Sequence, residues 1–265
     1  MNASHTPTIH SATAMFPGYS YLEAIRLFVA GVSEPLYGEA SSAAIQLCPQ
    51  SSGHLDEAAV EALAASHPDT AFRLHANCRA TDGFRMLDAS TFSDYTRGYY
   101  EALADRSHRL GATAYSLHAG YAANCDLATM IDNVHRIQDI FGPSCQVAVE
   151  GLYPNAHRPQ LMDSWAAYEA VMRAGLFQAV DCSHINIVAR REGSRNFGLL
   201  RELISSPNTI EIHVSDNNGT NDAHAVLEQT PWWWPAISHA GPNAMVFSES
   251  NQVRHQARAA AAAAA

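Results

Sequence analysis

The sequence predicts a single (β/α)8 barrel, and three observations support this fold class. Short β-rich runs alternate with helical patterns along the chain, which is typical of βα units with a parallel sheet. The chain has 265 residues, close to the roughly 250 residues of one such barrel. Metal-binding side chains recur at or just past the ends of the β-rich runs, where the strands of a barrel converge on one face.

The β-rich runs define eight expected strands, at residues 8–15, 43–48, 71–75, 113–118, 146–151, 177–181, 209–214 and 244–248. Expected helices lie between them, at residues 21–32, 56–66, 91–110, 127–141, 164–174 and 197–205. The strand number and the chain length favour closure into a barrel over an open doubly wound sheet. No GxGxxG or GxxxxGKS/T motif follows an expected strand, which argues against a nucleotide-binding fold.

No linker or compositional break divides the chain, so residues 1–256 are expected to form one barrel domain. Residues 257–265 form an Ala-rich tail, which is either a helical extension or an artefact and receives no function. The tryptophan run at 232–234 follows the seventh expected strand. These rings either wall a substrate pocket or pack in the core.

The charge balance excludes some partners. Acidic residues outnumber basic ones by 26 to 16, the net charge is −10, and the chain contains no Lys. Nucleic-acid-binding proteins usually carry a basic surface that neutralises phosphates, so long nucleic acid is not an expected partner. No run reaches the roughly 18 apolar residues that span a bilayer, and no signal peptide is evident. The sequence therefore predicts a cytoplasmic protein without a membrane partner.

Nine side chains are candidate metal ligands: His75, His118, Glu150, Asp181, His184, His213, Asp222, His224 and Glu249. Zinc, manganese and iron accept neutral imidazole and carboxylate oxygen, and a bridging carboxylate can hold two neighbouring ions. One histidine at a strand end is usually structural. Packing gives no reason for a whole series of such residues at successive strand ends, so the pattern predicts a polynuclear metal site and hence a metalloenzyme.

The segments around these residues resemble, in the same order, the ligand segments of the xylose isomerase-like and endonuclease IV-like TIM barrels. They are LHA at His75, LHAGY at His118, VEGLYP at Glu150, VDCSH at Asp181 and His184, IHVSDN at His213, DAH at Asp222 and His224, and SES at Glu249. The resemblance implies one ion on His75, His118 and Glu150. It implies a second on Glu150, Asp181, His213 and Glu249, with Glu150 bridging, and a third on His184, Asp222 and His224.

Three reactions are compatible with such a site. The chain resembles, more distantly, multinuclear non-haem iron enzymes that modify peptides oxidatively. This reaction is favoured, because N- and O-ligated iron with an open position binds O2 and substrate together. The alternative is metal-dependent isomerisation or epimerisation of a sugar, in which Glu150 and Glu249 would shuttle a proton. The third is phosphodiester hydrolysis of the AP endonuclease type, because metal ions can stabilise both oxygens of the displacement.

The expected catalytic residues are Glu150, Glu249 and His184. The expected cofactor is a set of two or three divalent or trivalent metal ions, with iron favoured over manganese or zinc. The expected substrate is a small polar metabolite or a short peptide, and a partner protein is compatible with the peptide-modifying reaction. Against an epimerase, the resemblance implies an Arg in the loop after His213, which the segment SDNNGTNDAH lacks. An epimerase would also have no use for His75, His118, Asp222 and His224.

Overall fold

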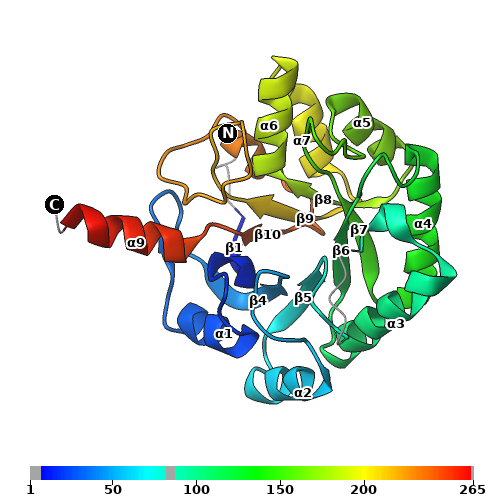
Figure 1. The fold of residues 1–265 in the computed structure, drawn as a ribbon. Helices are drawn as coiled ribbons and strands as arrows, with labels where there is room; N and C mark the ends of the chain where they lie inside the picture. The colour runs from blue at the N-terminus through cyan, green and yellow to red at the C-terminus, as the bar shows by residue number, and fades with distance from the viewer. Residues whose placement is uncertain (1–6, 82–86, 264–265) are drawn as a thin grey trace.

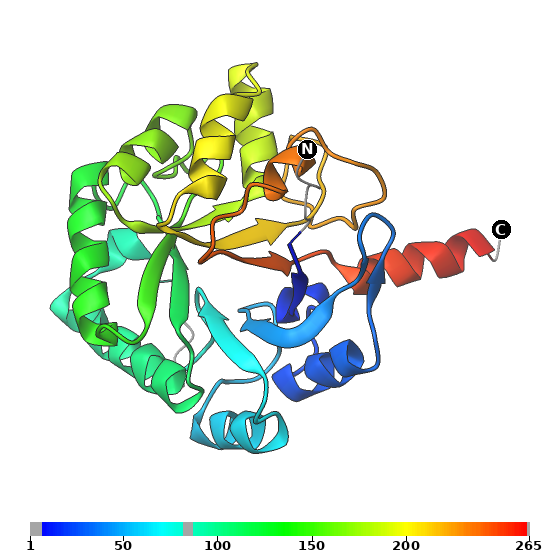
Figure 2. The same cartoon turned by 180° about the vertical axis from the view of Figure 1, so that it is seen from behind.

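The computed structural model describes residues 7–81 and 87–263. Within these ranges, eight parallel strands close into a barrel in chain order and helices surround it (Figure 1, Figure 2). The strands are β1 (Ile9–Ala12), β4 (Ser41–Leu47), β5 (Ala71–His75), β6 (Ala114–His118), β7 (Gln146–Glu150), β8 (Phe177–Asp181), β9 (Thr209–Val214) and β10 (Met245–Ser248). The last strand pairs with the first, β10 with β1, which closes the sheet. The predicted (β/α)8 barrel is confirmed.

The covering helices are α1 (Tyr21–Val29), α2 (Glu57–Ser66), α3 (Asp94–Arg109), α4 (Leu127–Phe141), α5 (Trp165–Arg173), α6 (Cys182–Glu192) and α7 (Phe197–Ser205). Polar side chains fix where several of them begin. Ser20 and Glu23 form a capping box at α1, and the Asp126 carboxylate accepts the Thr129 N–H at α4. None of the described helices is long and apolar enough to cross a membrane.

Several elements differ from those expected. The strand expected at 8–15 is shorter, because its second half turns into the 3-10 helix η1 (Thr13–Met15). A two-stranded antiparallel hairpin, β2 (Ser33–Glu34) with β3 (Gly38–Glu39), precedes β4. Helix α6 was not predicted, and it begins directly at the end of β8. Helix α9 (Gln252–Ala263) projects from the barrel and runs across the boundary expected at residue 256.

The tryptophan run contributes to packing. Trp233 is fully buried at the start of the short helix α8 (Trp234–Ile237). The Trp234 ring stacks on that of Tyr37, with centroids 6.1 Å apart. Trp232 donates its indole N–H to Oδ1 of Asn186 over 2.8 Å. Of the two roles left open by the sequence, core packing is the one that Trp233 has.

A buried polar layer crosses the barrel interior. The Arg73 guanidinium on β5 donates to the Ile210 carbonyl over 2.6 Å and lies 3.4 Å from Oε1 of Glu211 on β9. Oε2 of Glu211 accepts from Nε2 of Gln46 over 2.9 Å. Burying a charge is costly unless it is paired and hydrogen-bonded, so these three side chains depend on one another. Gln46 and Glu211 both contact His213, and the layer is therefore the floor of the candidate site.

Replacing Glu211 by Ala would leave Arg73 inside the barrel without its carboxylate. We expect the free energy of unfolding to fall by about 3–5 kcal/mol, the usual cost of breaking a buried ion pair by removing one partner. Urea denaturation followed by circular dichroism measures this change. Glu169→Ala is the matched control, because Glu169 pairs with Arg173 on the exposed face of α5. An equal loss in both variants would contradict the role assigned to the buried pair.

Candidate metal centre

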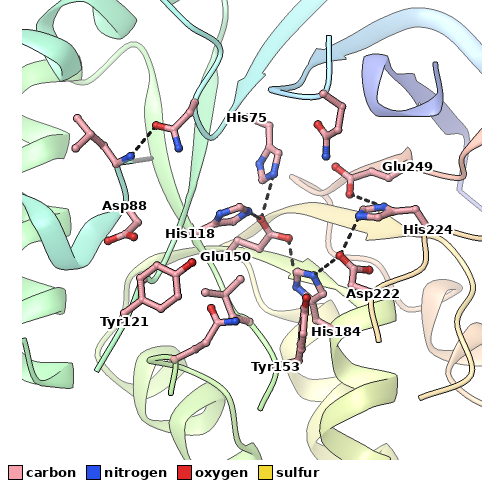
Figure 3. Close-up of a pocket in the computed structure, with 16 residues that line it drawn as sticks. His75, Asp88, His118, Tyr121, Glu150, Tyr153, His184, Asp222, His224 and Glu249 are labelled. Atoms are coloured by element: carbon pink, nitrogen blue, oxygen red, sulfur yellow. Dashed lines mark hydrogen bonds and ion pairs between the residues drawn. The ribbon is translucent and has the colours of Figure 1, made fainter. Parts of the chain in front are cut away.

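The predicted ligand residues all lie at one mouth of the barrel, around the C-terminal ends of its strands. Figure 3 shows them except for Asp181 and His213. His75, His118, Glu150 and Asp181 are the last residues of β5, β6, β7 and β8. His213 lies near the end of β9, Glu249 directly follows β10, and His184 lies in the first turn of α6. Asp222 and His224 come from the loop after β9.

Glu150 lies at the centre of this cluster. Its Oε2 lies 3.3 Å from Nε2 of His75 and 3.3 Å from Nε2 of His118. Its Oε1 lies 3.3 Å from Nδ1 of His213 and 3.6 Å from Nδ1 of His184. Imidazoles from four different elements thus face one carboxylate. This arrangement suits a carboxylate that is shared between neighbouring cation sites.

Several buried ligand atoms find no hydrogen-bond partner among the described residues: Oε2 of Glu150, Oδ2 of Asp181, Nδ1 of His224 and Oε1 of Glu249. An unpaired buried polar atom costs free energy, so these atoms would be stabilised by a partner beyond the hydrogen bonds of the described residues. Two atoms bound about 2.1 Å from one ion at a tetrahedral angle lie about 3.4 Å apart. The 3.3 Å separations at Oε2 of Glu150 have this spacing, so the donor set fits bound metal ions.

Among residues 7–81 and 87–263, three sets of side chains bring their ligand atoms within 4.8 Å of one another. They are His75, His118 and Glu150; His75, His213 and Glu249; and Glu150, Asp181 and His184. The first set is the one predicted for the first ion. The other two divide the residues differently from the predicted second and third ions, since His75 joins His213 and His184 joins Glu150. The assignment of residues to individual ions stays a prediction.

Three of the histidines are anchored through one ring nitrogen. The contacts are Nδ1 of His75 with Oγ of Ser116 at 3.0 Å, Nδ1 of His184 with the Gly151 carbonyl at 2.9 Å, and Nε2 of His213 with Oε2 of Glu211 at 3.4 Å. Partners of this kind fix the tautomer and the orientation of a metal-binding imidazole. The other nitrogen of each ring faces the carboxylates of the cluster.

Asp181 serves both the fold and the site. Its Oδ1 accepts the backbone N–H groups of Ser183 and His184, over 2.6 and 3.2 Å, and so caps α6. This cap explains why a helix begins at once where a strand-end turn was expected. The first turn then carries His184 back over the barrel, with Nε2 lying 3.6 Å from Oδ2 of Asp181.

Asp222 and His224 form the outer edge of the cluster. Oδ2 of Asp222 lies 3.3 Å from Nε2 of His184 and 2.9 Å from Nε2 of His224. His224 has a φ of 44°, in the left-handed region that non-glycine residues rarely adopt. Its carbonyl accepts the Asn251 N–H over 2.7 Å, which helps to hold the strained residue in place. Strain of this kind clusters at functional sites.

The electrostatics of the cluster favour a cation. Burial raises the pKa of Glu249 to about 7 and lowers the pKa of His75 to about 3, so His75 is neutral, the form that binds metals. Burial also opposes the charged form of His213, but the carboxylates of Glu249 and Glu150 outweigh it and raise the pKa of His213 well above its usual range. A positive charge among these carboxylates is thus stabilised, on a protonated imidazole or on a metal ion.

A cavity of about 170 Å³ opens beside the cluster. Residues that the sequence analysis did not select also line it, among them Asp88, Tyr121, Tyr153 and Gln160. Asp88 and Tyr121 lie on the side of this cavity away from His224 (Figure 3). Tyr121 and Tyr153 belong to the segments LHAGY and VEGLYP, so the position of these segments at strand ends could have indicated that both tyrosines lie near the site. Asp88 and Gln160 lie in loops that carry no comparable pattern.

No family model and no curated protein matches this chain. Solved structures do match it. A D-tagatose 3-epimerase-like protein superposes with a TM-score of 0.68 at 12% sequence identity, over 96% of each chain. An AP endonuclease, family 2, from Brucella melitensis superposes with a TM-score of 0.63 at 16% identity, over 92% of this chain and 93% of that one.

A xylose isomerase domain containing protein from Salmonella typhimurium superposes with a TM-score of 0.61 at 14% identity, over 98% of each chain. Identities this low establish the fold and nothing finer. The resemblance to xylose isomerase-like TIM barrels, drawn from the sequence, is confirmed at the level of the fold: the chain is a TIM barrel of the kind shared by these proteins.

Proposed function

We propose that the protein is a metal-dependent isomerase or epimerase that acts on a small hydroxylated carbonyl compound. The observation that carries this proposal is the placement of Glu150 at the end of β7 and of Glu249 directly after β10, with the His213 imidazole between them. Nδ1 of His213 lies 3.3 Å from Oε1 of Glu150 and 3.8 Å from Oε1 of Glu249. Two carboxylates on either side of one imidazole suit removal and return of one proton.

The comparisons support this reaction better than the iron-dependent oxidation that the sequence favoured. Epimerases and xylose isomerase domain proteins stand among the structural neighbours, and a D-allulose 3-epimerase from Methylomonas sp. has a TM-score of 0.55 over 91% of this chain. Iron-dependent oxidation has no support from them. A cavity of about 170 Å³ also suits a small molecule better than a peptide with its partner protein.

The side chains have distinct tasks in this reaction. One glutamate takes the proton from the carbon next to the carbonyl and the other returns one, to the opposite face for epimerisation or to the neighbouring carbon for isomerisation. His75, His118, Asp181 and His213 would hold the ions together with the glutamates. A bound ion would supply Lewis-acid polarisation of the substrate oxygens. His184, anchored to the Gly151 carbonyl, would orient Asp222 at the outer edge.

Metal-dependent hydrolysis of a phosphoester is the second candidate. It is favoured by one observation, the presence of Asp222 and His224 beside His184, which a single-ion epimerase does not need. Several ions can activate water and stabilise both oxygens of an in-line displacement. An AP endonuclease family 2 protein among the neighbours has the same fold. Against DNA as the substrate stands the net charge of −10 in a chain without Lys.

Glu150→Ala is expected to lose more than one metal ion per chain, because this carboxylate belongs to two of the three ligand sets. Metal content after equilibrium dialysis against manganese, zinc or, without oxygen, ferrous iron measures the loss. Glu34→Gln is the control: Glu34 is also a buried glutamate, but it accepts from Gln252 and the Leu227 N–H outside the cluster. Full metal content in Glu150→Ala would show that Glu150 does not bridge.

Glu150→Gln and Glu249→Gln are each expected to slow turnover by about 10²- to 10⁴-fold, the usual contribution of a general acid or base. The assay incubates the metal-loaded protein with D-fructose in D2O and follows deuterium incorporation by NMR. Glu228→Gln is the control, because Glu228 is an exposed glutamate of the loop after β9, with 69% side-chain exposure.

The same assay separates the two candidate reactions. Asp222→Ala should reduce ketose turnover only modestly, since the proton-shuttling glutamates remain. No incorporation with any of the metals would refute the isomerase proposal and favour the hydrolase.

The protein is expected not to incise a duplex that contains an abasic site, even at low salt, because DNA phosphates repel a chain with a net charge of −10. Gel electrophoresis of the labelled duplex after incubation with the zinc-loaded protein measures incision. Efficient cleavage that disappears in Glu150→Ala would reverse the order of the two candidate functions.

A further inference from the structure

Asp88 is an acidic side chain in the wall of the cavity, and the proposed proton transfer does not involve it. It is 5% exposed and lies across the cavity from His224 (Figure 3). The loop that carries it precedes the 3-10 helix η2 (Ala89–Thr91). Its carboxylate therefore both caps that short helix and is exposed to a ligand in the cavity.

Asp88 is held in a closely built frame. Its Oδ1 accepts from the backbone N–H of Ser90 over 3.0 Å and from Oγ of Ser90 over 2.5 Å. Its carbonyl accepts from the Tyr100 hydroxyl over 2.8 Å. Oγ of Ser90 in turn accepts from the Tyr121 N–H over 3.1 Å and from Nδ2 of Asn124 over 2.9 Å. The frame fixes the carboxylate relative to the loop after β6, which begins just past His118.

Gly120 makes room for this carboxylate. A Cβ atom at Gly120 would overlap with Oδ1 of Asp88 and Oγ of Ser90. The glycine also has a φ of 92°, which favours glycine over any other residue. Two separate segments, at 88–90 and at 120–121, are therefore shaped around the same carboxyl group. A cap for a helix of a single turn does not require this accommodation.

The chemistry of a fixed carboxylate limits what binds beside it. An ionised carboxylate only accepts hydrogen bonds, so it pairs with hydroxyl donors and disfavours a phosphate or a second carboxylate. The Arg158 guanidinium lies 3.4 Å from the Tyr121 ring centroid, stacked on a residue that lines the cavity. Arg158 does not itself line the cavity, but an anion bound near Tyr121 would pair with its guanidinium, so the two alternatives give opposite preferences.

We propose that Asp88 is a specificity-determining residue that accepts a hydrogen bond from a substrate hydroxyl and selects an unphosphorylated polyol-like substrate over its phosphate esters. The proposal rests on the proposed function, because it assumes that the cavity beside the metal cluster is the substrate site.

The test measures binding of D-fructose, D-fructose 1-phosphate and D-fructose 6-phosphate to the manganese-loaded protein by calorimetry. The wild type should bind D-fructose at least tenfold more tightly than either ester. Asp88→Asn should weaken D-fructose binding about tenfold or more, as expected for loss of a hydrogen bond to a charged group, and reduce the discrimination against the esters. Asn caps helices as well as Asp does, so this variant keeps η2.

Asp126→Asn is the matched control, because Asp126 caps α4 by the same kind of contact at an exposed position. Equal effects of Asp88→Asn and Asp126→Asn would reduce Asp88 to a cap and overturn the proposal. The proposal would also be overturned if either ester bound as tightly as D-fructose. If that ester binding were then lost in Arg158→Gln, Arg158 would be assigned to an anion site. Binding of none of the probes to the wild type overturns it as well.

The change of preference in Asp88→Asn and the failure of the proposed function are measured separately, the first by affinity and the second by deuterium incorporation. An absence of deuterium incorporation into D-fructose refutes isomerisation whichever way the binding preference falls. A preference that changes in Asp88→Asn still supports Asp88 as the selective residue, since it is measured by affinity and not by turnover.

Discussion

The burial of several carboxylates at one end of the barrel is the constraint on which the rest of the site depends. Glu150, Asp181 and Glu249 are each no more than 3% exposed, and each has an oxygen without a hydrogen-bond partner among the described residues. Burying such groups is tolerated only if cations accompany them. The imidazoles around Glu150 supply part of that compensation, and metal ions would supply the rest. The site is thus organised around buried carboxylates whose charge must be balanced by protonated imidazoles, by bound metal ions or by both.

The barrel supports this arrangement in three different ways. Parallel strands bring His75, His118 and Glu150 to neighbouring positions, and the register pairs His118 directly with Glu150. Below them, the paired Arg73 and Glu211 fill the interior and hold one nitrogen of His213. Above them, the loop after β9 places His224 in a strained conformation. The layer of Arg73 and Glu211 is buried and held by paired charges. The outer edge, formed by His224 and its neighbour Asp222, is held by a loop.

This division also explains how much the sequence could predict. Residues at strand ends were predictable, because the geometry of a barrel forces them to converge whatever the details of packing. The grouping of the ligands was less predictable, since it depends on side-chain directions: these place Nε2 of His184 near the carboxylates of both Asp181 and Asp222. Helix α6 was missed because the chain turns from strand to helix within one residue, with Asp181 as the cap. Asp88 was missed because its place depends on a frame of loop contacts with Ser90 and Gly120.

The site has more candidate ligands than a single-ion isomerase needs. In the sequence this excess argued against isomerisation, but in the structure the argument is weaker. The three ligand sets overlap, with His75 and Glu150 each belonging to two of them. Because the sets share ligand atoms, they cannot all be filled independently. The number of candidate ligands therefore does not give the number of bound ions. Residues left over when one or two ions bind are free to orient ligands or to transfer protons. A large ligand set is therefore compatible with proton-transfer chemistry, and the placement of Glu150 and Glu249 carries more weight than the count.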